Sequence, residues 1–538
     1  MVATSGFKRL GFAIVALVAA GCVAVGLASF LIPADAARDA VKAEIRAVTG
    51  FDPVVRGPVT VSLFPSGTVS FANVVLGDDQ DREPAFAAEG LIAHLRFFPL
   101  FVGRVEVSDV TLVRPTIAIV YNAEGQSNWS ALIDTLTRTL KPDAKNTGGV
   151  VSFSEMKIAD GTIVIRDAAH KLSEKLTGVE FALAWPSISK SFGATGRFVW
   201  HDQPVDASLT LSDFLSALSG DRSGLKFRLS GSPLKAAFDG FMSRRPTLKI
   251  EGTLAADAPS LRDALRWAGE KPWPGGGFGH FALKAQTSVV GGTIGLSGVN
   301  VELDGNTAEG VLTYAIDGRR TLQGTLAVEG LDLTPYISTV RLLAVNARDW
   351  DRMPIVLDGL MDFDVDLRLS AAHVTLGNAR LGRTAVAANL RSGRLVVTVG
   401  ESQAFSGIIK GSFGLAKSDP GADVKAQMTF TDVDLESCLG ELFNLRRVEG
   451  KGDLALNMEG SGANVFAVTR TLNGTASLVG RRGALVGLDV EQLLRRLERR
   501  PLSGGGEFRS GQTPYDKLTV AMKISNGTMT VDNVKIDG

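Results

Sequence analysis

Three aspartates that alternate along the chain, Asp362, Asp364 and Asp366, are spaced as cation ligands often are. A calcium-binding loop would also need glycine at its sixth position, for a sharp turn, and glutamate at its twelfth, as a bidentate ligand. Leu367 and His373 occupy these positions. Because side chains on a strand alternate between its faces, the three carboxylates would share one face. We interpret them as the solvated face of a strand.

Serine, histidine and glycine motifs give no catalytic constellation either. Ser154 and Ser187 each begin an S-x-x-K match, but the sequence has no S-D-N or K-T-G element to go with them. The five histidines are never four residues apart, and no H-E-x-x-H, C-x-x-C or G-x-S-x-G occurs. Residues 275–279 follow a proline-rich stretch and lack the third glycine of a nucleotide-binding loop, so we interpret them as a linker. We predict a protein that is not an enzyme and uses no metal or cofactor.

An uncharged run over residues 10–32 determines on which side of a membrane we expect the rest of the chain to lie. At 1.5 Å per residue it would span about 34 Å as a helix, enough for a bilayer core of about 30 Å. Lys8 and Arg9 precede the run, which predicts a cytoplasmic N-terminus and an extracytoplasmic body. The side chains expected to anchor the chain in the membrane are Leu10, Ile14, Leu17, Val25, Leu27 and Ile32.

Two other interpretations of this run stay open. A cleaved signal peptide usually has an apolar region of about 7–15 residues, which is shorter than this run. A lipoprotein signal would place a lipid on Cys22, which ends the sequence Ala-Ala-Gly-Cys, but the chain stays apolar after Cys22. The length of the run favours an uncleaved anchor.

The composition narrows the class of protein. With 538 residues the chain is too long for one compact core, so we expect several modules or an elongated body. Lys+Arg and Asp+Glu both number 57 and no basic stripe is visible, which argues against a nucleic-acid partner. Of the two cysteines, Cys22 lies in the apolar run and Cys438 is far from it, so no disulfide framework is expected.

From residue 51 onwards the hydrophobic pattern has a period of two. Short runs that alternate apolar and polar residues, separated by turns rich in Gly, Pro or Asp, predict antiparallel strands with one apolar face. Helices are predicted at residues 212–219, with Ser212 as the cap, and at residues 261–269. Residues 298–314 and 390–411 share a theme of strand, turn and returning strand, which predicts stacked hairpins in an extended body.

Several segments resemble the AsmA family in their order and spacing. Near the N-terminus they are Thr49-Gly50 and residues 61–65 (VSLFP), 97–107 (FFPLFVGRVEV) and 125–129 (GQSNW). Near the C-terminus residues 472–478 (LNGTASL) and 483–494 (GALVGLDVEQLL) resemble the family's most specific signature. The family pattern usually continues where this sequence stops, so either the sequence is a fragment or its last sheet has an open edge.

The resemblance implies an inner-membrane protein whose body lies in the periplasm and is similar to bridge-like lipid-transfer proteins. Together with the alternation, it predicts a mainly β fold: an elongated, curved antiparallel β-sheet groove of repeated hairpins with a few short helices, preceded by one N-terminal transmembrane helix. We divide the chain into a cytoplasmic tail and anchor (1–33), an N-terminal AsmA-like domain with a juxtamembrane helix (34–149), two groove segments (150–270 and 271–430) and a C-terminal AsmA-like domain, truncated if the sequence is a fragment (431–538).

We consider two functions and favour the first, because a membrane anchor, an elongated mainly β body and few helices to cover the sheet together point to a groove. In the first, the groove shields phospholipid acyl chains and supports lipid transport and outer-membrane assembly, with membrane phospholipids, the inner membrane and outer-membrane assembly proteins as partners. In the second, the same body is an assembly or regulatory factor for protein targeting to the outer membrane and carries no lipid. The residues expected to line a groove are Val61, Leu63, Val105, Val107, Ile117, Ile163, Ile165, Val301, Leu303, Val397 and Val399.

Overall fold

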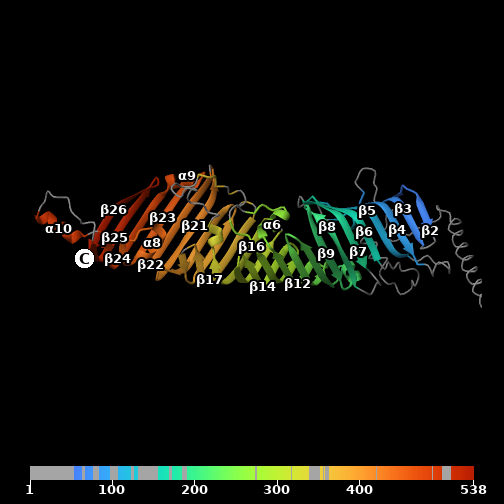
Figure 1. Cartoon of the computed structure of the whole chain (residues 1–538), viewed down its shortest axis with the longest axis horizontal. Coiled ribbons are helices and arrows are strands. Elements are labelled where there is room, and N and C mark those ends of the chain that lie inside the picture. Colours follow the sequence, from blue (N-terminus) through green and yellow to red (C-terminus); the bar gives the residue numbers. More distant parts are fainter. Residues whose placement is uncertain are drawn as a thin grey trace, which may run out of the picture. The chain divides into compact units, whose positions relative to one another are not determined.

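The computed structural model confirms the mainly β class (Figure 1). It describes residues 54–62, 67–76, 84–96, 107–122, 126–130, 155–168, 172–184, 191–272, 276–316, 318–337, 352–355, 357, 361, 363–377, 379–419, 421–487, 489–499 and 511–538. The chain divides into two compact units, Met1–Leu254 and Ala255–Gly538, and the division falls within strand β12 (Lys249–Ala258). Each unit is described by itself below.

The strands of the first unit follow one another along the chain as neighbours. They are β1 (Val54–Val55), β2 (Val59–Ser62), β3 (Thr68–Leu76), β4 (Phe86–Leu95), β5 (Val107–Tyr121), β6 (Glu155–Asp167), β7 (Leu172–Ala184), β8 (Phe192–Trp200), β9 (Gln203–Leu211), β10 (Ser223–Gly231) and β11 (Lys235–Ser243). β1 and β2 both pair with β3, and the pairing then runs in chain order to β11. All of these pairs are antiparallel except β5–β6, which is parallel.

The second unit repeats this plan over a longer set of strands. They are β13 (Phe281–Val290), β14 (Thr293–Leu303), β15 (Asn306–Ala315), β16 (Arg320–Asp332), β17 (Phe363–Leu376), β18 (Ala379–Leu381), β19 (Thr384–Arg391), β20 (Arg394–Ala404), β21 (Gly407–Ser418), β22 (Gly421–Asp434), β23 (Val448–Gly462), β24 (Asn473–Val486), β25 (Gln512–Ser525) and β26 (Thr528–Asp537). Antiparallel neighbours run from β13 to β16 and from β17 to β26, with β18 and β19 both paired to β17. The β16–β17 pair is parallel.

The predicted hairpins at residues 298–314 and 390–411 are confirmed as β14–β15 and β20–β21. The last strand, β26, pairs with β25, and all ten of its residues are exposed. No described pairing joins β26 to β13, so the sheet of the second unit is open in the part that the structure describes.

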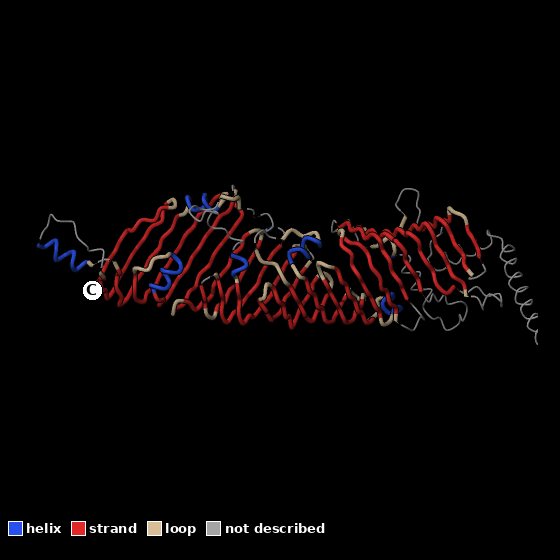
Figure 2. The backbone as a smooth tube through the Cα atoms, in the orientation of Figure 1, coloured by secondary structure: helices blue, strands red, loops and turns tan. Residues whose placement is uncertain are grey.

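The helices are short and follow strands (Figure 2). They are α5 (Phe214–Ser219), α6 (Leu261–Trp267), α7 (Thr334–Ile337), α8 (Leu435–Phe443), α9 (Val465–Thr471) and α10 (Val490–Arg499). The helix predicted at residues 212–219 is present as α5, but its predicted cap is wrong. Asp213 caps it by accepting from the Ser216 N–H at 3.0 Å, while the Ser212 hydroxyl accepts from the Gly224 N–H at 2.8 Å. A carboxylate at this position satisfies an orphan amide and complements the helix dipole.

The loop at residues 276–279, which the sequence predicts as a linker, is fastened to its surroundings. The Asp304 carboxylate accepts hydrogen bonds from the Phe278 N–H (2.9 Å), the Gly279 N–H (2.7 Å) and the Tyr336 hydroxyl (2.5 Å). Arg262 of α6 donates to the carbonyls of Gly276 and Gly277 at 3.2 Å. The module boundary predicted here stays a prediction.

The predicted anchor residues Leu10, Ile14, Leu17, Val25, Leu27 and Ile32 lie outside the described residues, as does the predicted juxtamembrane helix. Within the residues that are described, no helix combines the length and the apolar character needed to cross a bilayer.

Candidate apolar lipid-facing strip

The register of the second unit places apolar residues from seven neighbouring strands in two continuous rows on one face of the sheet. Each row takes one residue from β16, β17, β19, β20, β21, β22 and β23, in register with the next. We call these two rows the apolar strip. The first row is Leu326, Leu369, Val386, Val399, Gly411, Met428 and Leu456, and the second row is Gly324, Leu367, Ala388, Val397, Phe413, Ala426 and Met458.

The strip is apolar without being a closed core. All of its residues are partly exposed, and Phe413 is exposed to 42 %. Side chains on a sheet face that is packed against a second layer lose nearly all contact with water, so the described structure leaves this face incompletely covered. Seven strands at about 4.8 Å spacing make the strip about 29 Å long.

One side of the strip is bounded by a row that is covered. On β21, Ile409 lies two residues before Gly411 of the strip, and on β22 its partner Phe430 lies two residues after Met428 of the strip. Both therefore share the face of the strip, and both are 7 % exposed. They belong to one buried cluster with Leu435, Cys438 and Leu439 of α8. Farther along the same row, Thr384 and Ser402 are buried and their hydroxyls hydrogen-bond each other at 2.8 Å. Helix α8 thus forms a rim along this side.

Helix α9 bounds the other side of the strip near β23. Gly460 lies two residues beyond Met458 and therefore on the same face. A Cβ on Gly460 would lie 3.0 Å from the Val468 carbonyl oxygen of α9, so the helix packs directly on the backbone there. On β23, Leu454 belongs to the covered row, and Gly460 lies about 20 Å farther along the strand. The strip residues Leu456 and Met458 lie between these two positions. At β22 and β23, which both helices contact, the strip thus lies between two helical rims.

The first unit carries a similar face over β6–β11. One row consists of Met156, Leu183, Ala194, Leu209, Phe227 and Phe238, and the next of Ile158, Phe181, Gly196, Ala207, Leu229 and Ala236. All of these residues except Ala194 are partly exposed. At β1–β5, by contrast, apolar residues such as Phe71 (2 % exposed) and Val110 (7 %) form a buried cluster.

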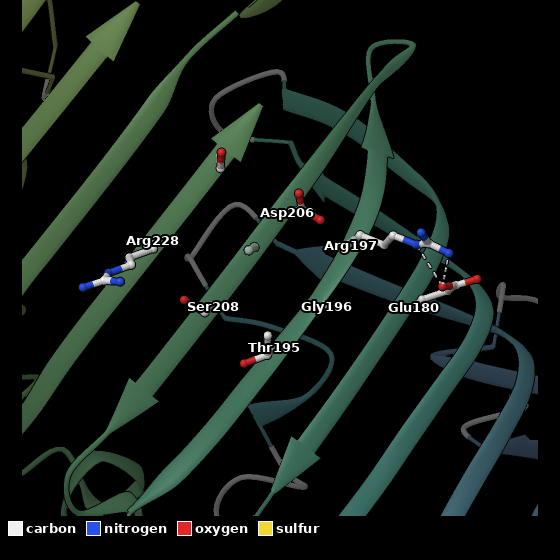
Figure 3. A pocket seen from close by; sticks show the side chains of 9 residues that line it. Glu180, Thr195, Gly196, Arg197, Asp206, Ser208 and Arg228 are labelled. Atoms are coloured by element: carbon white, nitrogen blue, oxygen red, sulfur yellow. Dashed lines mark hydrogen bonds and ion pairs between the residues drawn. The ribbon is translucent and has the colours of Figure 1, made fainter. Parts of the chain in front are cut away.

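The opposite face of these strands is polar and charge-paired. Glu180 and Arg197, which are cross-strand neighbours in β7 and β8, form an ion pair at 2.7 Å (Figure 3). Lys226 and Asp239 do the same at 2.9 Å. A shallow depression of about 550 Å³ lies here, with Glu180, Thr195, Gly196, Arg197, Asp206, Ala207, Ser208, Arg228 and Ser230 around it. Exposed pairs of this kind contribute little stability, so their main effect is to keep this face hydrated and near neutral.

The eleven groove residues predicted from the sequence fall in different surroundings. Val397 and Val399 lie in the apolar strip. Val301 packs against the buried cluster of Ala308 and Val374, and Leu303 ends β14. Three more, Val61, Val107 and Ile117, pack against the buried cluster of the first unit. Ile163 pairs with Ile117 across the parallel strands β5 and β6, and Ile165 lies two residues farther along β6. Leu63 and Val105 lie outside the described residues. Their contact with lipid stays a prediction.

The prediction from sequence missed the larger side chains of the strip. Phe413, Met428, Leu456 and Met458 were not singled out, although each has a polar residue on at least one side in its strand. The period-two pattern was the available signal, but it does not say which apolar residues a helix will cover.

Groups capable of chemistry are scattered in the described part of the chain. No cluster of three or more His, Cys, Asp or Glu side chains that could hold a metal ion occurs among the described residues. Of the three aspartates, Asp362 lies outside the described residues, and Asp364 pairs with Arg319 at 2.6 Å. Burial raises the pKa of the Cys438 thiol to about 11, with Asp434 and Glu441 adding to the effect, so this thiol is unreactive near neutral pH.

Comparison with protein-family models gives one match, described as the AsmA family, over residues 7–258 and 343–534. These two segments cover most of the chain. The chain belongs to the AsmA family. No curated protein and no solved structure matched it.

Residues that carry AsmA-family motifs in this chain hold strands together. Asn128 and Trp129 of the GQSNW segment both donate to the carbonyl oxygen of Ala118 in β5, at 2.9 and 2.8 Å. Trp129 also packs against the buried cluster of the first unit. In the C-terminal AsmA signature, a Cβ on Gly483 would lie 2.6 Å from the Tyr515 hydroxyl, which donates to the Glu449 carbonyl at 2.6 Å. These motifs shape the scaffold that presents the apolar faces.

Proposed function

We propose that the apolar strip shields phospholipid acyl chains, and that the protein supports lipid transport and outer-membrane assembly without catalysing a reaction. The observation that carries this proposal is the pair of in-register apolar rows, with every residue partly exposed and with α8 and α9 on either side at β22 and β23. Membership of the AsmA family supports it. Acyl chains would partition onto the strip because each square ångström of apolar surface removed from water contributes about 25 cal/mol.

The proposal includes a location. Residues 10–32 would anchor the chain in the inner membrane, with a cytoplasmic N-terminus and a periplasmic body, and the length and apolar character of that run support this placement. Phospholipids of the inner membrane, and assembly proteins of the outer membrane, would be the partners. A lipid-free assembly or regulatory factor is the alternative that the experiment below separates from it.

A photo-crosslinker placed on each face of the sheet tests the proposal in intact cells that express the full chain. Phe413 is exposed on the strip, while Val311 in β15 is exposed to 51 % in phase with Glu309 and Thr313 on the opposite face. With benzoylphenylalanine at position 413, we expect phospholipid adducts after irradiation. At position 311 we expect none. Adducts to protein alone at position 413 would favour the assembly-factor alternative, and equal lipid adducts at both positions would contradict a role specific to the strip.

A further inference from the structure

Helix α10 is an insertion in a pair of bonded strands. β24 ends at Val486, which pairs with Gln512 at the start of β25, so residues 487–511 are an insertion between two bonded strands. The Gly487 N–H donates to the Gly511 carbonyl at 2.8 Å, and the Val490 N–H donates to the Thr513 hydroxyl at 3.0 Å. These bonds fasten the base of the insertion and the first residue of the helix.

The sequence of α10, VEQLLRRLER, is amphipathic. Val490, Leu493, Leu494 and Leu497 recur at spacings of three and four residues, which defines one apolar stripe on a helix. Arginines occupy positions 495, 496 and 499 in the sequence of this helix, and Arg500 follows it in the chain. With four arginines against two glutamates over residues 490–500, the net charge is +2. Leucines on one face and arginines on the other are typical of helices that lie in a membrane interface.

One residue of this apolar stripe, Leu494, is left uncovered by the described structure. Leu494 is 56 % exposed, whereas Leu435 and Leu439 of α8 are 0 % and 5 % exposed. Arg495 pairs with Glu491 one turn earlier, and both side chains are more than 70 % exposed. A helix that packed its stripe on the sheet would bury Leu494, as α8 buries its own leucines. α10 therefore presents at least part of this stripe to its surroundings.

We propose that α10 docks on the surface of an anionic phospholipid bilayer. The leucine stripe would enter the boundary between headgroups and acyl chains, and the arginines would lie among the lipid phosphates. The contact is distinct from the acyl-chain role of the strip and from the N-terminal anchor, and it holds whether or not the strip carries lipid. At about 15 Å, a ten-residue helix gives a weak, reversible contact that depends on charge as well as on apolar surface.

Vesicle capture tests this contact with the full chain. The protein is held in nanodiscs of phosphatidylcholine and mixed with vesicles of phosphatidylcholine alone or with added phosphatidylglycerol, and co-flotation is measured. We expect capture by the anionic vesicles, loss of about tenfold in capture with Leu494→Asp, and loss at high salt. Leu442→Asp is the matched control, because Leu442 of α8 is also exposed, to 46 %. The proposal is overturned if capture is absent, if uncharged vesicles capture equally, or if Leu494→Asp is captured like the wild type.

A fluorescent reporter identifies the contact directly. Leu494→Cys in a Cys22→Ser background offers one accessible thiol for an environment-sensitive dye, because Cys438 is 0 % exposed. We expect the emission to shift to the blue when anionic vesicles are added. Emission that is already blue-shifted before vesicles are added would mean that the stripe packs on protein, and it would contradict the proposal. Phe413→Asp should leave vesicle capture unchanged. The outcome of this test therefore does not depend on whether the acyl-chain proposal is correct.

Discussion

At the scale of single residues, Phe413 shows how the strip differs from a core. It lies in β21, in register with Val397 on one side and Ala426 on the other, and it keeps 42 % of its surface exposed. Two residues earlier, Gly411 lies under Met428, whose sulfur would be 2.5 Å from a Cβ at that position. A bulky side chain on one strand thus covers a glycine on the next.

Gly196 in the first unit gives a prediction about this packing. A Cβ on Gly196 would overlap the Glu180 carbonyl oxygen and lie 2.7 Å from Cα and 2.8 Å from Cγ of Phe181 in the neighbouring strand, so Gly196→Ala must displace the β7 backbone as well as the aromatic ring. We expect a loss of about 1–3 kcal/mol in the free energy of unfolding, the usual result of overpacking. Tryptophan fluorescence during denaturant unfolding of the full chain measures it.

Gly193→Ala is the matched control for this substitution. Gly193 lies in the same strand, β8, and a Cβ there would meet no atom within 4 Å. We expect it to unfold at the wild-type denaturant concentration or slightly above, because alanine restricts the unfolded chain more than glycine does. Equal destabilisation by both substitutions would show that the close contact of Gly196 with Phe181 and its strand does not cause the loss of stability.

At the scale of elements, short helices at strand ends set the limits of each apolar face. Helices α8 and α9 connect β22 to β23 and β23 to β24, and each packs on the strip's face at one of its sides. In the first unit, α5 connects β9 to β10, and Phe214 packs on Phe192 with ring centroids 4.9 Å apart. The places where α8 and α9 pack on the sheet therefore decide how much of these strands remains uncovered.

The cap of α5 should depend on pH. Hydrogen bonds from the Ser216 backbone and hydroxyl hold the pKa of Asp213 below its usual value. A carboxyl group whose folded pKa is lowered stabilises the fold above its unfolded pKa of about 3.9, and this contribution is lost as the pH falls through the folded pKa. We expect amide exchange at Ser216 and Ala217, corrected for intrinsic rates, to lose protection on acidification in that range.

Asp213→Asn separates the cap from its charge. Asparagine also caps helices well, so protection should persist in this variant, but without the acid-dependent loss. If the wild type keeps full protection below its folded pKa, or if the asparagine variant loses it in the same range, the charge of Asp213 is not responsible.

Strands and helices were easier to predict from the sequence than which apolar side chains a helix covers. The alternation in β14, β15, β20 and β21 predicted strands and hairpins correctly, because the period of two is a local property. The cap of α5 was wrong because Ser212 and Asp213 are adjacent and both suit an N-cap, and only the tertiary bond from Gly224 to Ser212 separates them. Cover by α8 depends on contacts between residues far apart in sequence, such as Leu435 and Ile409, which alternation cannot reveal.

At the scale of the whole molecule, the AsmA-family chain consists of two units with the same plan. Within the described residues, each has mostly antiparallel neighbours, one parallel pair, an apolar face with partly exposed rows and a polar face with paired charges. The plan predicts that lipid contact is a property of a face rather than of a site. One charged residue in the strip should therefore reduce lipid retention, while the same residue on the opposite face should not.

Counting the phospholipids retained by the purified full chain tests this claim most directly. The measurement is native mass spectrometry after detergent exchange, and it compares the wild type with Phe413→Asp and Val311→Asp. Any lipid held by the N-terminal apolar run is common to all three proteins, so a difference between them reports the contribution of the strip. We expect wild type and Val311→Asp to retain the same number of phospholipids and Phe413→Asp to retain fewer, because a carboxylate beside acyl chains is costly to desolvate. Equal retention in all three folded proteins would contradict the account.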